Sequence, residues 1–135
     1  MSDFPVTIYH NPDCGTSRNA LAMIEAAGHT PVVIDYRRTG WTRGQLGDLL
    51  AAMHAAPRDL LRDKGTPAAE LGLLDPEVPD EAILEAMLRD PLLVNRPIVT
   101  TPKGTKLCRP SEAVLALLDK APATFVKEDG EIVRR

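Results

Sequence analysis

Apolar residues change their spacing several times along the chain, and each change predicts a different element. Residues 6–10 form a short β-type segment, and from residue 14 to about residue 27 the apolar positions recur every three or four residues, as in a helix that packs on a sheet. Gly28 follows as the expected end of that helix, and residues 31–36 are a continuous apolar run between turn residues. This order predicts a right-handed parallel unit of strand, helix and strand.

The pattern is helical over residues 42–93. Thr42 is a candidate N-cap, and short breaks at Pro57, residues 65–67 and residues 75–76 separate the predicted helices. We therefore expect an all-helical insertion at about residues 42–93, between the second strand and the third.

Strand patterns return after the insertion. Residues 97–101 and 105–109 flank a short turn and predict a β-hairpin, and residues 110–118 carry the apolar stripe of a closing helix. The expected fold is α/β, with a four-stranded mixed sheet built from β-α-β followed by β-β-α. We expect one domain over residues 1–120 and a polar, loosely attached tail over residues 121–135.

Composition limits the function classes. A chain of 135 residues with 44% apolar content can bury one core. It has no apolar run of about 18 residues and no basic-then-apolar N-terminal segment, which predicts a cytoplasmic protein without a membrane partner. The formal charge is −3 and no stripe of lysines and arginines carries interleaved aromatics, which argues against nucleic acid as a partner. The two cysteines do not resemble a disulfide framework, which also fits a reducing compartment.

Cys14 stands where the first strand has ended in a turn and the helical pattern begins. The first backbone N–H groups of a helix lack internal partners and carry partial positive charge, so they favour a thiolate over a neutral thiol. A small buried cysteine is the alternative, but the exposed first turn of a helix is a poor place for it. Ser17 occupies the second cysteine position of a C-x-x-C frame, so a second thiol must come from elsewhere. A reactive cysteine at the first strand-to-helix turn, with this element order, is typical of a thioredoxin-like domain.

Three segments together resemble those of the glutaredoxin-coupled arsenate reductases: residues 9–19 (YHNPDCGTSRN), 95–99 (NRPIV) and 104–112 (GTKLCRPSE). Residues 60–62 and 127–131 resemble that family as well, so the similarity spans nearly the whole chain. The resemblance implies that one nucleophilic cysteine reduces arsenate to arsenite, with glutathione and glutaredoxin as electron donors. It also implies that glutathione is a co-substrate and that no cofactor is bound.

The resemblance implies a role for each matching residue. Cys14 corresponds to the nucleophile, and the three arginines that bind the oxyanion correspond to Arg62, Arg96 and Arg109. Arsenate is anionic and the chain is net negative, so the site must be locally cationic, and a guanidinium gives paired donors to a tetrahedral oxyanion. For Arg62 a surface role is the alternative, because its guanidinium can form weak surface ion pairs with the neighbouring aspartates.

His10 and Pro97 complete the implied site. His10 is expected to stabilise the thiolate, directly or through Ser17, and we favour an indirect electrostatic role over that of a loop cap. Pro97 begins the third strand, where thioredoxin-like domains carry a proline after a cis peptide bond; an ordinary trans proline is the alternative. One histidine in the loop, with no cysteine or histidine at ligand spacing near it, predicts no metal site.

Asp13 and Cys108 complicate this interpretation. A carboxylate at Asp13 is expected to raise the pKa of Cys14, so the helix N–H groups, His10 and the arginines must outweigh it. Cys108 precedes Arg109 on a strand, so alternation points it to the opposite face. We expect a buried structural cysteine there rather than a resolving thiol.

Two other functions stay open. One is a thioredoxin-fold monothiol reductase of another substrate, such as glutathione mixed disulfides, with the arginines binding glutathione carboxylates. The other is a non-enzymatic Spx-type regulator that binds RNA polymerase. Against the regulator stand Ser17 in place of a second cysteine and the three matching arginines.

Overall fold

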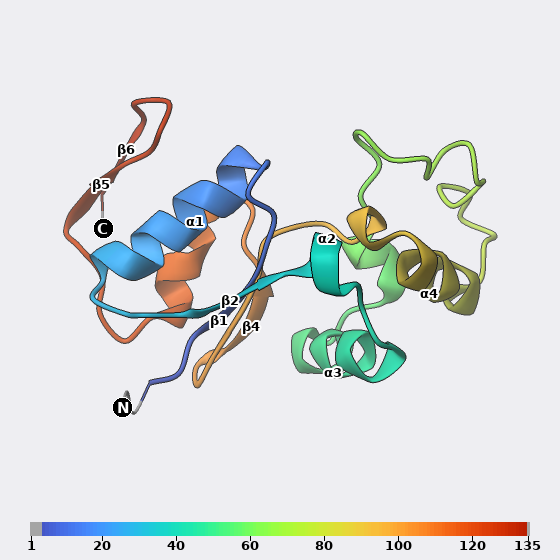
Figure 1. Cartoon of the computed structure of the whole chain (residues 1–135), viewed down its shortest axis with the longest axis horizontal. Helices are drawn as coiled ribbons and strands as arrows, with labels where there is room; N and C mark the ends of the chain where they lie inside the picture. Colours follow the sequence, from blue (N-terminus) through green and yellow to red (C-terminus); the bar gives the residue numbers. More distant parts are fainter. Residues whose placement is uncertain (1–3, 135) are drawn as a thin grey trace. The chain divides into compact units, whose positions relative to one another are not determined.

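The computed structural model describes residues 4–134, which group into two compact units (Figure 1). The sheet unit comprises the residues up to Asp35 together with those from Arg96 onward, and the helical unit comprises Tyr36–Asn95. The predicted insertion at residues 42–93 lies inside the helical unit, while a single domain over residues 1–120 stays a prediction. No helix within residues 4–134 is long and apolar enough to cross a membrane.

The sheet unit is built on four strands: β1 (Thr7–His10), β2 (Val32–Asp35), β3 (Ile98–Thr101) and β4 (Gly104–Leu107). Their order is β2-β1-β3-β4, with β1 parallel to β2 and antiparallel to β3, and with β3 antiparallel to β4. The central strand β1 places Ile8 opposite Val33 on one side and opposite Val99 on the other. The mixed four-stranded sheet expected from the sequence is therefore confirmed.

Helix α1 (Gly15–Ala26) and the 3-10 helix η3 (Ser111–Leu117) pack against each other in the sheet unit. Gly28, after α1, has φ +92°, a left-handed conformation that glycine adopts without strain. A cluster of buried apolar side chains joins α1, η3 and the sheet: Val6, Ile8, Ala20, Met23, Ile24, Ala27, Val99, Cys108, Val114, Leu117 and Leu118.

The closing segment is a 3-10 helix, not an α-helix. Hydrogen bonds three residues apart join the Ala113 N–H to Pro110 O at 3.0 Å and the Leu118 N–H to Leu115 O at 3.3 Å. The last carbonyls are taken by side chains: Thr101 Oγ1 donates to Leu117 O at 2.6 Å. In a longer α-helix these carbonyls would accept from backbone N–H groups of the following turn. Here side-chain donors at the β3–β4 turn satisfy them instead.

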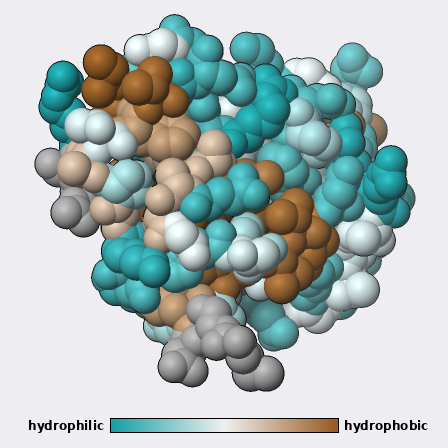
Figure 2. Space-filling model, turned by 60° about the vertical axis from the view of Figure 1, so that its left-hand side comes forward, coloured by the Kyte–Doolittle hydropathy of each residue, from teal (hydrophilic) through white to brown (hydrophobic). Residues whose placement is uncertain are grey.

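The C-terminal segment is a β-hairpin of β5 (Thr124–Val126) and β6 (Ile132–Arg134), so the expectation of a loosely attached tail is wrong. Val133 is 9% exposed and packs on the core cluster. The polar residues that suggested a loose end instead pair across the fold, with Glu128 on Arg18 of α1 at 2.7 Å. Phe125 is partly buried against the same cluster, whereas Val126 and Ile132 are exposed. Figure 2 shows separate brown patches among polar surface on one face of the molecule.

The helical unit contains five helices: α2 (Tyr36–Thr39), α3 (Arg43–Met53), η1 (Pro57–Leu60), α4 (Asp80–Arg89) and η2 (Pro91–Leu93). Thr42 caps α3 as predicted, since its hydroxyl accepts from the Gln45 N–H and the Gln45 side chain accepts from the Thr42 N–H. The Tyr36 ring stacks on Trp41 with centroids 5.0 Å apart.

Residues 61–79 contain no helix, so the expectation of helix throughout the insertion is wrong. Leu61 forms an isolated β-bridge with Val94, and mostly turns and bends follow. Gly65 and Gly72 adopt left-handed φ values of 75° and 74°, and prolines within the segment lack the N–H that a helix needs. Thr66 Oγ1 donates to Arg62 O at 2.7 Å, which gives that carbonyl a partner outside any helix. The apolar residues of this segment, such as Ala68, are buried without forming a helix, so their spacing indicated burial and was mistaken for helix.

Candidate active site

The turn between β1 and α1 carries Cys14, and hydrogen bonds within the turn fix its shape. The Cys14 N–H donates to Asn11 O at 3.0 Å, and the Asn11 side-chain Oδ1 accepts from the Asp13 N–H at 2.9 Å. Cys14 is the N-cap residue of α1, in an extended conformation and with no side-chain capping bond. Its sulfur therefore stands at the start of the helix and is not used to cap it.

Opposing effects set the acidity of the Cys14 thiol. Burial raises its pKa, whereas hydrogen bonds from the Ser17 backbone N–H and from the Arg96 and Arg109 guanidinium groups lower it. The hydrogen bonds outweigh burial, and the pKa falls from an ordinary 9.0 to about 7. About half of the Cys14 side chains are therefore thiolate at pH 7. The exposed Asp13 carboxylate does not prevent this lowering.

Arg96 and Arg109 lie at the same end of the sheet. One precedes β3 and the other follows β4, and these strands are antiparallel with Ile98 opposite Leu107. Arg109 Nη1 lies 3.8 Å from Cys14 Sγ and donates to Arg96 O at 2.8 Å. The Arg96–Pro97 peptide bond is cis, the isomer that the resemblance implies. The sheet unit thus brings two of the three predicted arginines to the predicted nucleophile.

His10 contacts α1 through Ser17. His10 Nδ1 lies 2.6 Å from Ser17 Oγ, which also accepts from the Asn11 N–H at 3.1 Å. His10 and Ser17 are 7% and 0% exposed, so the contact is shielded from water. Because the Ser17 N–H is one of the groups that lower the pKa of Cys14, this contact supports an indirect role for His10. The catalytic roles of His10 and Ser17 stay predictions.

Arg62 belongs to the helical unit, and its guanidinium is held by two local acceptors. Nε donates to Lys64 O at 3.1 Å and Nη1 donates to Asn95 Oδ1 at 3.1 Å. Asp59, one of the aspartates expected to pair with it, instead accepts from the Ala56 N–H at 2.8 Å. Its role toward an oxyanion stays a prediction.

Cys108 is fully buried in the core cluster, and burial raises its pKa to about 12. The expectation of a structural cysteine is confirmed. Within residues 4–134, no group of three or more histidine, cysteine or carboxylate side chains is placed to hold a metal ion.

These elements and side chains match one family over most of the chain. Residues 9–117, from the end of β1 to the end of η3, match the family model described as the ArsC family. The chain belongs to the ArsC family. The matched range includes Cys14, the three arginines and the whole helical unit.

Relatives of this ArsC-family chain are similar over nearly their full length. Arsenate reductase ArsI1 of Synechocystis is 58% identical over 134 residues, which cover 98% of this chain and 93% of that protein. An arsenate reductase of Escherichia coli is 53% identical, over 95% of this chain and 92% of that one. A solved structure of an arsenate reductase from Vibrio cholerae matches with a TM-score of 0.81 at 36% identity, covering 87% of this chain and 100% of that chain. The expected family and its thioredoxin-like fold are confirmed.

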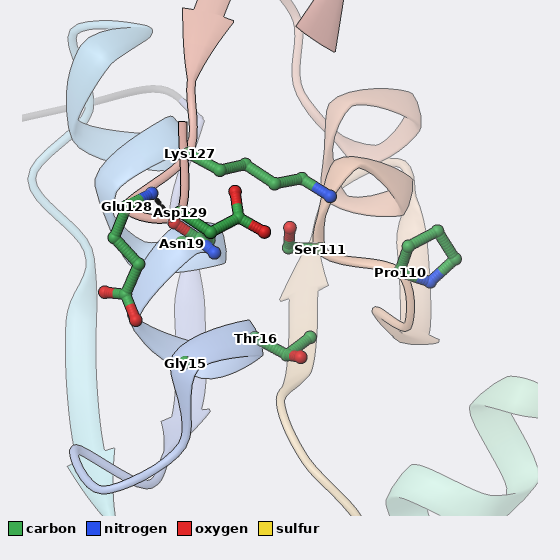
Figure 3. Close-up of a pocket in the computed structure, with 8 residues that line it drawn as sticks. All are labelled: Gly15, Thr16, Asn19, Pro110, Ser111, Lys127, Glu128 and Asp129. Carbon is green, nitrogen blue, oxygen red and sulfur yellow. Dashed lines mark hydrogen bonds between the residues drawn. The ribbon is translucent and has the colours of Figure 1, made fainter. Parts of the chain in front are cut away.

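A cavity of about 280 Å³ lies beside the first turns of α1, and the sequence did not point to it (Figure 3). Its walls come from three segments: Gly15, Thr16 and Asn19 of α1, Pro110 and Ser111 at the start of η3, and residues 127–129 in the turn of the C-terminal hairpin. Such a site joins residues more than a hundred positions apart. The available signal was the resemblance of residues 127–131 to the arsenate reductase family.

Proposed function

We propose that this ArsC-family protein reduces arsenate to arsenite with Cys14 as its only reacting thiol. One observation carries the proposal: the Cys14 sulfur lies 3.8 Å from Arg109 Nη1 and has a pKa of about 7. A thiolate beside guanidinium groups suits attack on an anion that the same groups hold. The names of the relatives, arsenate reductases, give the substrate.

Each predicted site residue takes a part in this proposal. Arg96 and Arg109 donate to the arsenate oxygens as they do to the sulfur, and Arg62 is the third oxyanion ligand on the strength of the resemblance. His10 positions Ser17, and the Ser17 N–H favours the thiolate. Guanidinium groups suit the task because they stay charged and offer donors in pairs.

The reaction balances with two external thiols. The Cys14 thiolate forms a bond to arsenic(V), and one arsenate oxygen leaves as water. Glutathione then forms a second As–S bond, and a second oxygen leaves as water. A glutaredoxin thiol attacks the glutathione sulfur, the As–S bond breaks with its electron pair left on arsenic, and a mixed disulfide departs. Water cleaves the remaining bond to Cys14 and releases arsenite, so that two thiols have become one disulfide.

The electrons come from outside the chain because Cys108 is unsuited to supply them. It is 0% exposed, and its pKa of about 12 leaves almost no thiolate near neutral pH. Glutathione and glutaredoxin fill that role, with no bound cofactor. We place the reaction in the cytoplasm, where thiols are kept reduced.

The test is a coupled NADPH assay with arsenate, glutathione, glutathione reductase and glutaredoxin. Cys14→Ser is expected to abolish arsenite formation, and Cys108→Ala to keep most of it. Equal loss from both changes would contradict the single-thiol mechanism and indicate an internal disulfide. Turnover of a glutathione mixed disulfide without turnover of arsenate would favour a general monothiol reductase instead.

A further inference from the structure

We infer that the cavity beside Cys14 binds the amino-acid end of glutathione, the end that carries an α-ammonium and an α-carboxylate on one carbon. The inference rests on the proposed function for the identity of the thiol, and on the cavity itself for the place. Gly15 and Thr16 follow the nucleophile directly, and Pro110 follows Arg109, which contacts the sulfur. A thiol anchored in this cavity is therefore held beside the atom that it must reach.

Ser111 is the observation that points to a ligand. The residue is 2% exposed, yet no hydrogen bond of its hydroxyl is found within the described part of the chain. Figure 3 shows the hydroxyl directed into the space between η3 and the hairpin turn. The hydroxyl oxygen is not fully enclosed by protein atoms, so it opens to the cavity and can take a hydrogen-bond partner there. A bound carboxylate would give this hydroxyl its acceptor.

Other groups around the cavity suit the two charges of an amino-acid end. Asn19 uses its Oδ1 to accept from the Glu128 N–H at 3.0 Å, which leaves its amide N–H groups as donors for a carboxylate. Thr16 adds a hydroxyl at the same wall. Asp129 accepts from the Glu131 N–H at 2.9 Å through Oδ1, and no ion pair of its carboxylate occurs among residues 4–134. That carboxylate is the partner for an ammonium group.

The charges at the hairpin turn decide which end of glutathione fits. Lys127 is committed to Glu112 at 2.8 Å and Glu131 at 3.2 Å, and Glu128 is committed to Arg18 at 2.7 Å. Figure 3 shows the Glu128 side chain directed away from the Lys127 and Ser111 side. Asp129 is then the uncompensated charge, and it is negative. A group with both charges is accommodated here, whereas the glycine carboxylate of glutathione, which has no ammonium beside it, is not.

The direct test uses S-methylglutathione, which cannot react, and isotope-labelled full-length protein without arsenate. Saturable NMR shifts are expected at the amides of Gly15, Thr16 and Ser111. Ser111→Ala and Asp129→Asn are each expected to weaken binding about tenfold, the effect of losing one charge-assisted hydrogen bond. Thr7→Val and Glu25→Gln, which remove a hydroxyl and a carboxylate away from the cavity, are the matched controls. N-acetylation of the ligand should weaken binding to the wild type as much as Asp129→Asn does.

Folding does not obscure this test. Ser111→Ala strands no partner, because the hydroxyl has none among the described residues, and Asp129→Asn keeps the Oδ1 acceptor on an exposed residue. Shifts confined to other residues, or equal affinity in wild type and both variants, would overturn the inference. A turnover assay separates the two ideas: binding here without arsenate reduction by any thiol refutes the proposed function alone, and arsenate reduction without binding here refutes the inference alone.

Discussion

Arg109 contacts Cys14, the proposed nucleophile, and one substitution removes this contact. Its Nη1 lies 3.8 Å from Cys14 Sγ and donates to Arg96 O at 2.8 Å. Arg109→Ala removes both contacts together with one positive charge. Because an opposite charge within about 4–6 Å lowers the pKa of an acid by ~1–3, we expect the pKa of Cys14 to rise from about 7 to about 8 or above.

Two separate losses follow for catalysis. At pH 7 a pKa of about 8 reduces the thiolate from roughly half to roughly 9% of the Cys14 side chains, about a fivefold loss of nucleophile. Charge-assisted hydrogen bonds to arsenate are lost as well, at ~1.5–3 kcal/mol or roughly 10- to 150-fold in kcat/KM. The first loss disappears at a pH well above both pKa values, and the second remains. Arg109→Lys restores the charge but not the paired donors, so the pKa recovers more fully than kcat/KM.

The assay follows thiolate absorbance and iodoacetamide alkylation of Cys14 against pH, and then kcat/KM for arsenate at pH 7 and at the alkaline plateau. Arg89→Ala is the matched control, since the Arg89 side chain is 79% exposed and its ion pair with Glu85 is 3.5 Å long. An unchanged pKa of Cys14 in Arg109→Ala would refute the electrostatic argument. An unchanged kcat/KM at the alkaline plateau would refute the assignment of Arg109 to the oxyanion.

Three further predictions concern stability, each measured by chemical denaturation. Ser17→Ala is expected to cost ~1–3 kcal/mol, because it strands the buried Asn11 N–H and His10 Nδ1, and a cost equal to that of Thr7→Val would contradict this. Removal of residues 121–135 is expected to lower the free energy of unfolding by at least about 1.5 kcal/mol, since Val133 leaves the core. A truncated chain with the stability of the wild type would show that the hairpin is only loosely attached. The difference in stability between wild type and Cys14→Ser is expected to increase from pH 7 to pH 9 in favour of the wild type. In this range the unfolded thiol, at its ordinary pKa of 9.0, binds more protons than the folded one. A stability difference that does not change with pH would show that the pKa of Cys14 is not lowered.

The sheet was predictable because β1, β2 and β3 are short runs rich in apolar or β-branched residues, and β4, which is mostly polar, pairs with β3 across a short turn. Residues 61–79 and the C-terminal segment were predicted wrongly, because contacts with other parts of the chain determine their conformation. Residues 61–79 bury apolar side chains such as Ala68 and Leu73 in turns, and apolar spacing cannot separate burial in a turn from burial in a helix. The hairpin was predicted to be a polar tail because the partners of its charges, Arg18 and Glu112, lie outside the segment, in α1 and η3.

The residues of the site also differ in how far the sequence alone predicts them. Cys14 was recognisable from local order alone, since a strand, a turn and a helix start dictate where its sulfur stands. The pair of Arg96 and Arg109 needed the resemblance, because their approach to Cys14 depends on the antiparallel pairing of β3 with β4. The cavity needed the fold itself, because its walls meet only when the hairpin turn lies against α1.

The two cysteines of this chain differ in burial and acidity, and that difference bears on the redox cycle that we propose. With pKa values of about 7 and about 12, Cys14 is partly ionised near neutral pH while Cys108 is a buried thiol of the core. In the proposed mechanism each pair of electrons arrives through a thiol that approaches Cys14 from solvent, and the oxidised product leaves the same way. Such a cycle gains most from a site that holds the incoming thiol in register with the sulfur, since positioning replaces an intermolecular encounter by a local one. The cavity that begins at Gly15, with the uncommitted hydroxyl of Ser111 in its wall, is where the sheet unit offers that site.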